Sequence, residues 1–313
     1  MALPRLVPDG QFFRLADGRL FTVIEATDFS LYLRYLRGED VTAMLAQRAA
    51  VGFNTLRVWL LNTSVLAAVD GRGLHPDWYS DFYTRLRPFV DLCASFGCYV
   101  EFTVFTQTQT LMPETSRQQA HLTQTGEAVR DATNVLLDQV NEFDLYDNAC
   151  DPWLTRPVGV LASRGCAGAD GMPPRPPWDY ELYHTNGLLE WWRKTGHNAM
   201  ELGAETNKPC MSNENTRYPD QDASLTHAYD AAAGAALLCA GACYHSASGK
   251  LSTLWAGTEL AAAQAWVDGA RSVPLEFQRG VYGHRTDLEG PNCIRAYEKR
   301  LSDGRSYVVL IRP

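Results

Sequence analysis

The 313-residue chain contains no long uninterrupted apolar segment. Its longest apolar run, at residues 231–244, is rich in Ala and Gly and is too short to span a bilayer as a helix. The first residues, MALPRLVPDGQFF, lack the continuous apolar core of a secretory signal peptide. We therefore expect no signal peptide and no membrane partner, and we expect residues 231–244 to form a buried helix that runs into a strand.

Motifs for metals and nucleotides are also missing. None of the eight cysteines forms a Cys-x-x-Cys pair, so a zinc site is not expected. Without a signal peptide, buried free thiols are favoured over disulfides. No GxGxxG motif and no GxxxxGK motif followed by Ser or Thr is present, so nothing supports a dinucleotide or P-loop site. The sequence predicts a protein that needs no metal and no organic cofactor.

Basic side chains are too few to favour a nucleic-acid partner. Lys and Arg number 28 against 36 Asp and Glu, which gives a net charge of -8 and a pI near 5.4. No basic stripe is present that could neutralise phosphates. The acidic balance fits a neutral substrate such as a sugar, although it does not select one.

Helix-like and strand-like segments alternate along the chain. Apolar residues at three- and four-residue spacing predict helices at 39–51, 76–96, 116–130, 188–202 and 258–269. Short, mostly apolar runs predict strands at 21–26, 53–60, 98–105, 134–142, 158–163, 178–184, 208–214 and 237–246. Each end of the chain carries a hairpin signal, one about Asp17-Gly18 and one about Asp303-Gly304.

Eight strands that are mostly separated by helices favour a closed parallel barrel over an open doubly wound sheet. The chain length suits a (β/α)8 TIM barrel with small additions. The connections after the fourth and fifth strands lack long helices, so we expect the barrel to be irregular around strands four to six. We predict one domain over residues 1–313, with an N-terminal hairpin at 1–20 and a C-terminal hairpin at 290–313 packed on the barrel.

Polar and acidic side chains gather where the predicted strands end. In such barrels the active residues lie at the C-terminal ends of the strands. The fourth, sixth, seventh and eighth strands end in Asn141-Glu142, Tyr183-His184, Asn213-Glu214 and Tyr244-His245. Two carboxylates that face each other across a barrel mouth suit glycoside hydrolysis, in which one protonates the departing oxygen and the other attacks the anomeric carbon or activates water. We therefore take Glu142 and Glu214 as the catalytic candidates.

Three segments resemble the clan A glycoside hydrolases, which are retaining (β/α)8-barrel enzymes. GFNTLRVWLLN resembles the second strand of that clan, NVLLDQVNE its fourth strand and KPCMSNE its seventh strand. The resemblance implies that Glu142 is the acid/base, beside Asn141, which would bind the sugar 2-hydroxyl. It also implies that Glu214 is the nucleophile, with Arg57 and His184 orienting it and keeping it ionised.

The sequence departs from the clan at two places. Phe143 follows the Asn-Glu pair where many members have Pro, and the eighth strand ends in Tyr244-His245 where many have Trp. These departures bear on the substrate more than on the chemistry. We expect Tyr244, His245, Trp59 and Trp178 to contact the substrate together with Arg57, Asn141 and His184.

Each candidate has a structural alternative. Glu142 could be a loop cap or an ion-pair partner, and Arg57 and Glu214 could be an ion pair that lines the barrel. Asn141 could close a loop, the two histidines could be satisfied structural residues, and the tryptophans could be core residues. At the level of the whole chain, the alternative to a glycosidase is a non-catalytic carbohydrate-binding or structural barrel module, for example in a virion or a larger assembly.

The expected partner in either case is a carbohydrate, and the sequence leaves the oligomeric state unknown. Because polysaccharide hydrolases usually act outside the cell, the expected lack of a signal peptide needs an explanation. We expect a cytoplasmic protein, or a virion-associated or lysis-released one if a phage carries it.

Overall fold

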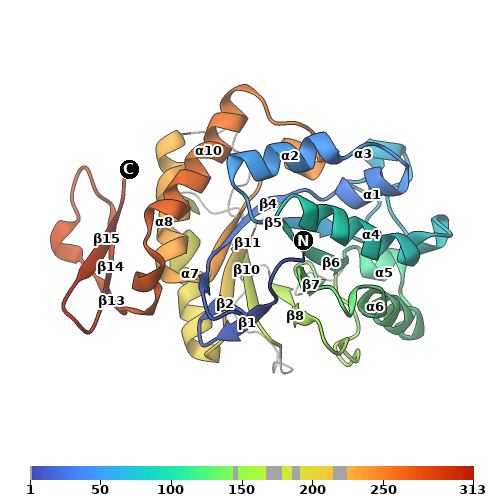
Figure 1. Cartoon of the computed structure of the whole chain (residues 1–313), viewed down its shortest axis with the longest axis horizontal. Coiled ribbons are helices and arrows are strands. Elements are labelled where there is room, and N and C mark those ends of the chain that lie inside the picture. The colour runs from blue at the N-terminus through green and yellow to red at the C-terminus, as the bar shows by residue number, and fades with distance from the viewer. Residues whose placement is uncertain (1, 144–146, 167–177, 185–190, 214–223) are drawn as a thin grey trace. The chain divides into compact units, whose positions relative to one another are not determined.

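The computed structural model describes residues 2–143, 147–166, 178–184, 191–213 and 224–313 (Figure 1). Its contacts divide the chain into two compact units. Unit 1 comprises residues 1–5, 26–182 and 248–254, and unit 2 comprises residues 6–25, 183–247 and 255–313. Both units draw on distant stretches of sequence, so neither is a continuous half of the chain.

The main sheet has nine strands in the order β8-β7-β6-β5-β4-β12-β11-β10-β9. In chain order they are β4 (Val23–Thr27), β5 (Thr55–Trp59), β6 (Tyr99–Phe105), β7 (Val135–Val140), β8 (Leu161–Ser163), β9 (Gly165–Cys166), β10 (Glu181–His184), β11 (Cys210–Asn213) and β12 (Gly241–Tyr244). All but β9 are the eight parallel strands expected from the sequence, and the (β/α)8 barrel is confirmed. The described part of the connection from β7 to β8 contains no helix, as predicted. Most of the connection from β8 to β10 lies outside the described residues, so the expected loop there stays a prediction.

The strands of unit 1 form because each is an apolar run that is buried on both faces. Every residue of β5, β6 and β7 is buried, which is the pattern of central strands in a parallel sheet covered by helices. Their register places Trp59 beside Thr103 and Thr103 beside Asp138. The polar members of this row therefore share one face of the sheet, and they lie near the C-terminal ends of the strands.

The helices of unit 1 cover the strands with amphipathic faces. Helix α4 (Phe82–Ser95) buries Phe82, Leu86, Phe89, Val90 and Cys93, the face that the spacing predicts. The expected helix at 76–96 is divided, since a separate 3-10 turn, η1 (Pro76–Trp78), is capped by His75 and precedes α4. The remaining helices of this unit are α1 (Leu31–Leu36), α2 (Thr42–Val51), α3 (Ala67–Asp70), α5 (Thr108–Leu111), α6 (Thr115–Val129) and, at its boundary, α9 (Ala247–Lys250).

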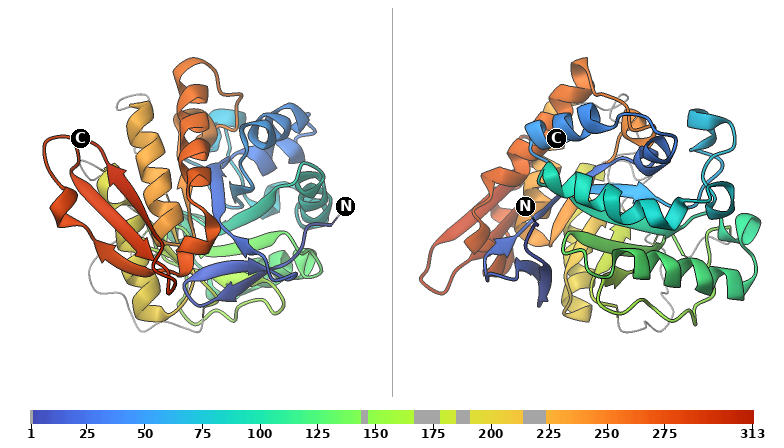
Figure 2. Two further views of the ribbon diagram at one scale, coloured as in Figure 1. Left: turned by 60° about the vertical axis from the view of Figure 1, so that its left-hand side comes forward. Right: turned by 45° about the vertical axis from the view of Figure 1, so that its right-hand side comes forward.

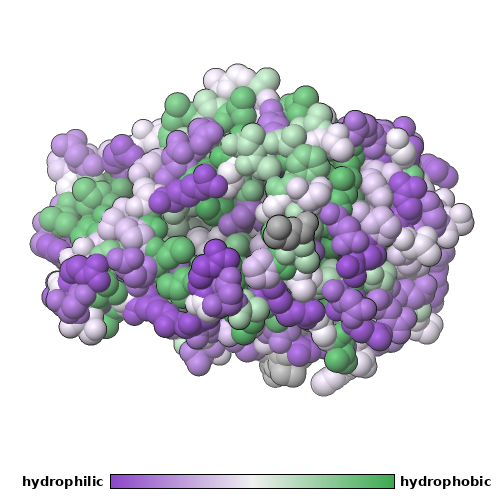
Figure 3. All heavy atoms as spheres, viewed as in Figure 1, coloured by the Kyte–Doolittle hydropathy of each residue, from purple (hydrophilic) through white to green (hydrophobic). Residues whose placement is uncertain are grey.

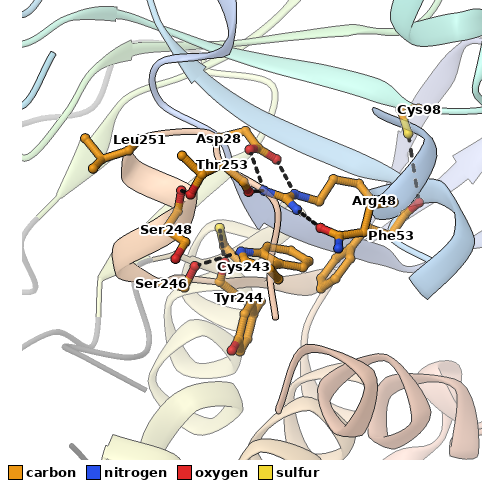
Figure 4. Close-up of polar contacts among 12 residues, drawn as sticks. Asp28, Arg48, Phe53, Cys98, Cys243, Tyr244, Ser246, Ser248, Leu251 and Thr253 are labelled. Carbon is orange, nitrogen blue, oxygen red and sulfur yellow. Dashed lines mark hydrogen bonds and ion pairs between the residues drawn. The ribbon is translucent and has the colours of Figure 1, made fainter. Parts of the chain in front are cut away.

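A buried ion pair joins α2 to the end of β4. Arg48 Nε and Nη2 donate to the two carboxylate oxygens of Asp28 at 2.9 and 3.1 Å, and both side chains are fully buried (Figure 4). Arg48 Nη2 also donates to the Thr253 carbonyl at 2.7 Å. Taking both charges out of water is costly, and the two-point geometry offsets that cost only while both partners are present. The ion pair therefore holds α2 against the end of β4, and the bond to Thr253 holds it against residues 248–254.

Unit 2 contains an alanine-rich helix that its neighbours approach closely. Helix α8 (Leu225–Leu238) lies between α7 (Trp191–Thr206) and α10 (Gly257–Ser272), and most of it is buried. A methyl group on Gly196 would lie 2.6 Å from the Gly234 carbonyl, and one on Gly269 would lie 2.1 Å from the Tyr229 carbonyl. Gly196 on α7 and Gly269 on α10 thus permit these two helices to pack closely against α8. Helix α8 begins earlier than the 231–244 run predicts, at Leu225.

Both predicted hairpins form, and each gains a third strand. The N-terminal sheet consists of β1 (Leu6–Asp9), β2 (Phe12–Leu15) and β3 (Leu20–Phe21). The C-terminal sheet consists of β13 (Val281–His284), β14 (Arg295–Arg300) and β15 (Ser306–Ile311), between the 3-10 turns η2 (Leu275–Arg279) and η3 (Thr286–Leu288) and the end of the chain (Figure 2). The glycine of each Asp-Gly turn has a positive φ, 91° at Gly18 and 87° at Gly304. The domain boundaries, one domain over 1–313 with terminal hairpins, stay a prediction.

The surface and the thiols are those of an ordinary globular chain. Hydrophilic and hydrophobic residues are interspersed on the face shown in Figure 3. Cys93, Cys98 and Cys239 are buried free thiols, and burial raises the pKa of Cys98 and of Cys239 to about 12. Among the described helices, none has both the length and the apolar character needed to cross a bilayer.

Candidate active site

Hydrogen bonds tie together the loops that follow β5 and β6 in unit 1. Asn62 Nδ2 donates to Thr106 Oγ1 at 3.0 Å. The Gln107 side-chain oxygen accepts from the Thr63 backbone N–H at 2.9 Å, while the Gln107 backbone N–H donates to Asn148 Oδ1 at 2.9 Å. Gln107 itself has φ 50°, a left-handed backbone that costs free energy outside glycine. These hydrogen bonds therefore hold the loops at this edge of the sheet in fixed positions.

Asn141 and Glu142 follow β7 at this edge, as the sequence predicts. The Asn141 backbone N–H donates to the Phe105 carbonyl at 3.0 Å, so pairing with β6 continues for one residue beyond β7. Glu142 then adopts φ 49°, which turns the chain out of the strand. Its side chain is partly exposed, and Asn141 Nδ2 lies 3.3 Å from Glu142 Oε2. Strained backbone of this kind clusters at functional sites, where the surrounding contacts hold it.

Arg57 lies beneath this pair in a fully buried network. Its Nη2 atom donates to Asn141 Oδ1 at 2.7 Å and to Asp138 Oδ2 at 3.1 Å. Thr103 Oγ1 donates to the same Asp138 oxygen at 3.0 Å. The side chains of Arg57 and Asp138 have no exposed surface. These contacts connect the predicted Arg57 to the predicted acid/base side of the site.

Trp59 closes β5 and is 6% exposed. Its ring stacks on Phe29 with the centroids 3.7 Å apart, and the Arg57 guanidinium lies 5.5 Å from the Phe29 ring. Among the described residues, no acceptor is found for the Trp59 Nε1–H group. A buried indole N–H usually has a partner, so this donor is suited to a substrate hydroxyl.

Phe143, the residue that departs from the clan pattern, is covered by a cation. The Arg164 guanidinium, which follows β8, lies 3.8 Å from the centre of the Phe143 ring. Cation–π contacts of this kind contribute about 0.5–2 kcal/mol depending on exposure. A Pro at this position would offer no aromatic face for the guanidinium.

The predicted residues of unit 2 lie at the ends of their strands. His184 is the last residue of β10, Tyr244 is the last residue of β12 and His245 follows it, and all three are buried. Asn213 ends β11 and is fully buried, whereas Glu214 lies outside the described residues. The pairing of Glu142 with Glu214 therefore stays a prediction.

The surroundings of Tyr244 and Trp178 favour packing over substrate contact. Tyr244 Oη donates to the Glu259 carbonyl at 3.2 Å, and its ring packs edge-on against Trp255, whose indole N–H bonds Ser246 Oγ (Figure 4). Trp178 is 5% exposed and precedes β10, so it lies at the N-terminal side of its strand. Active residues of barrels lie at the opposite ends. The substrate role of both residues stays a prediction without support from these contacts.

Sequence reasoning missed Asp138 and Thr103. Asp138 had a visible signal, since a carboxylate within the apolar run VLLDQV is rarely buried without a partner. Thr103 had none, because Thr is an ordinary strand residue. Within the described ranges, no group of three or more His, Cys, Asp or Glu side chains is placed to hold a metal ion.

Solved structures with a similar fold include several that are named as glycosidases. No protein-family model and no curated protein sequence matches the chain. A protein from Bacteroides vulgatus that is described as a candidate glycoside hydrolase superimposes with a TM-score of 0.62 at 14% identity, over 95% of this chain and 67% of the other. An exo-β-1,4-mannosidase from an Opitutaceae bacterium gives 0.54 at 15% identity, over 85% of this chain and 63% of the other.

A third similar structure has almost the same extent as this chain. A glycoside hydrolase family 5 mannosidase from Rhizomucor miehei gives a TM-score of 0.58 at 11% identity, over 87% of this chain and 98% of the other. The chain thus spans about two thirds of the first two proteins and matches nearly all of the third. At these identities the likeness shows the fold, which is the one that the clan A resemblance implies.

Proposed function

We propose that this chain is a retaining glycoside hydrolase that cleaves β-glycosidic bonds in an oligo- or polysaccharide. The observation that carries the proposal is the buried network of Arg57, Asp138 and Asn141 that leads to a partly exposed Glu142 at the end of the fourth barrel strand. A structural carboxylate would need neither the strained turn at Glu142 nor the buried cation behind it.

The proposed substrate is a β-1,4-linked mannan or its oligosaccharides. Three solved proteins of this fold are mannosidases or mannanases by their names, two of which are described as β-1,4-specific. Mannan is a neutral polymer, and the net charge of -8 does not favour an anionic one. The Trp59 N–H and the Asn141 amide are suited to sugar hydroxyls.

The reaction proceeds in two displacements. Glu142 gives its proton to the glycosidic oxygen as the bond to the anomeric carbon breaks, and the Glu214 carboxylate bonds to that carbon. Water then loses a proton to Glu142 and displaces Glu214, which restores both groups. Each step inverts the anomeric centre, so the product retains the β configuration.

The first test measures reducing ends released from β-1,4-mannan, with a panel of other β-linked glycans beside it. Wild-type chain should release sugar, and Glu142→Gln and Glu214→Gln should each lower kcat by about a thousandfold or more. Glu127→Gln removes an exposed carboxylate on α6 and should retain wild-type turnover. Binding to a glycan without release from any of them would favour the non-catalytic module instead.

The second test assigns the two roles by stereochemistry on aryl β-mannosides. In Glu214→Ala, azide should restore turnover by attacking the face that the nucleophile normally uses, giving an α-glycosyl azide. In Glu142→Ala, azide should intercept the glycosyl–enzyme and give a β-glycosyl azide. Reversed products would exchange the two assignments, and full activity in Glu214→Ala would remove it from the mechanism.

A further inference from the structure

We propose that Asp138 is a positioning residue of the acid/base, which holds Arg57 against Asn141 so that the Asn141 amide N–H group faces Glu142 and the substrate. This inference rests on the proposed function, in which Glu142 is the acid/base. It goes beyond the family resemblance, which assigns Arg57 to the nucleophile and assigns nothing to Asp138.

The orientation of Asn141 follows from the chemistry of Arg57. A guanidinium has only donors, so the Asn141 atom 2.7 Å from Arg57 Nη2 must be the amide oxygen. The amide nitrogen therefore points away from Arg57, and it lies 3.3 Å from Glu142 Oε2. The two ends of one amide are thus fixed in opposite directions, and Asn141 acts as a donor in the site.

Asp138 fixes Arg57 in the position that this orientation needs. The same Nη2 atom that bonds Asn141 donates to Asp138 Oδ2 at 3.1 Å, and Thr103 Oγ1 holds that oxygen from the neighbouring strand at 3.0 Å. Both charged side chains are fully buried, so neither has solvent to replace a lost partner. Without the carboxylate, the Arg57 side chain can take other positions, and the Asn141 side-chain oxygen loses the fixed N–H donor that orients it.

Asp138 also sets the charge behind Glu142. The Asp138 carboxylate opposes the positive charge of Arg57. Only the side-chain amide of Asn141 separates that charge from Glu142, since its oxygen contacts Arg57 and its nitrogen contacts Glu142. Other charged groups nearby in unit 1 are Glu101, beside Arg57 in the sheet register, and Arg164, over Phe143. Asp28, whose backbone amide donates to the Arg57 carbonyl, is a third, and its carboxylate is paired with Arg48. Loss of the Asp138 charge would make the surroundings of Glu142 more positive, which favours the ionised form of Glu142 and so lowers the pKa of the group that must donate a proton.

The test compares Asp138→Asn with the wild-type chain across a pH–rate profile. The carboxamide can still accept from Arg57 and Thr103, so the substitution removes charge while it keeps shape. We expect kcat to fall about tenfold or more and the alkaline limb of the profile to move down by about one pH unit. Asp91→Asn, which removes an exposed carboxylate paired with Arg87, should leave both unchanged.

A double variant separates charge from fold. Asp138→Asn combined with Arg57→Gln has no net charge at the pair, so its alkaline limb should return toward the wild-type position even though turnover stays low. A residue with a merely structural role would lower the amount of folded protein and leave the limb where it is in all variants. An unmoved limb in Asp138→Asn, or a limb that stays displaced in the double variant, would overturn the inference.

A measurement without turnover distinguishes this inference from the proposed function. Titration of the Glu142 carboxyl carbon by NMR, assigned by its loss in Glu142→Gln, should show a lower pKa in Asp138→Asn than in the wild type. That shift in a chain with no glycosidase activity would sustain the link between Asp138 and Glu142 while the proposed function fails. Equal pKa values would reject the link, whatever the activity.

Discussion

His121 makes folding stability depend on pH in a way that can be worked out from its surroundings. The side chain lies on α6, is 1% exposed, and its Nδ1 atom is 2.9 Å from the Tyr83 hydroxyl. Rings of Phe82, Tyr83 and Phe105 surround it at centroid distances of 5.5–5.8 Å. Burial lowers the pKa of His121 from 6.5 to about 3. The folded chain therefore keeps this imidazole neutral, while the unfolded chain does not.

The sign follows from proton binding. Below pH 6.5 the unfolded chain binds a proton at this position, whereas the folded chain binds none until about pH 3. The contribution of His121 to the free energy of unfolding is therefore fully present above pH 6.5 and is lost as the pH is lowered from 6.5 toward 3. Each pH unit within that window costs about 1.4 kcal/mol of unfolding free energy. At pH 5 the loss due to His121 alone is about 2 kcal/mol.

Urea unfolding at several pH values between 7.5 and 5 measures this loss. In His121→Gln the free energy of unfolding should fall less steeply below pH 6.5 than in the wild type, by about 1.4 kcal/mol per unit. Tyr83→Phe is the matched control, because it removes the same hydrogen bond and leaves the buried imidazole in place, so the wild-type slope should persist. Equal slopes in the wild type and His121→Gln would refute the reasoning.

Three further experiments test other features. Asp28→Asn removes the anionic partner that Arg48 bonds inside the protein, so it should lower the free energy of unfolding by about 3–5 kcal/mol. Asp91→Asn, at an exposed ion pair, should lower it by less than about 1 kcal/mol. Similar urea midpoints for the two variants would contradict this. Gly269→Ala should destabilise the protein, because the new methyl group meets the Tyr229 carbonyl. Gly234→Ala has room for the methyl group, so its stability should be unchanged or higher by up to about 1 kcal/mol through helix propensity. Thermal melts that rank the two variants in the opposite order would be evidence against the close α8–α10 contact. Trp59→Phe keeps an aromatic ring beside Phe29 and removes the N–H donor. KM for mannan oligosaccharides should therefore rise several-fold, with little change in Tm. An unchanged KM would exclude the proposed hydrogen bond to the substrate.

The residues DQVNEFD at 138–144 show how far local pattern carries. An apolar run followed by Asn-Glu predicts a strand that ends near residue 142, and β7 ends at Val140 with one further backbone bond at Asn141. The same reasoning takes Asp138 as part of the strand and gives it no role. Its partner Arg57 is 81 residues away, so no spacing rule connects the two.

The features that the sequence pattern did not reveal depend on contacts between distant parts of the chain. The two-residue strand β9 and the added strands β1 and β13 are too short or too polar for a periodic signal, and pairing with neighbours makes them strands. Trp178 and Tyr244 carry rings that suit either a sugar or a core, and only the contacts around them favour the core. Composition and spacing are blind to which surface an aromatic ring meets.

The sequence by itself determined the number and order of the barrel strands and the place where Asn141 and Glu142 emerge. Burial of a strand is written in a few consecutive apolar residues, so each strand can be recognised alone. The tertiary structure decided which groups those strands bring together, above all the contact of Arg57 with Asp138 and Asn141. Such contacts depend on the register between strands that are far apart in the chain, and register is set by the packing of the whole sheet.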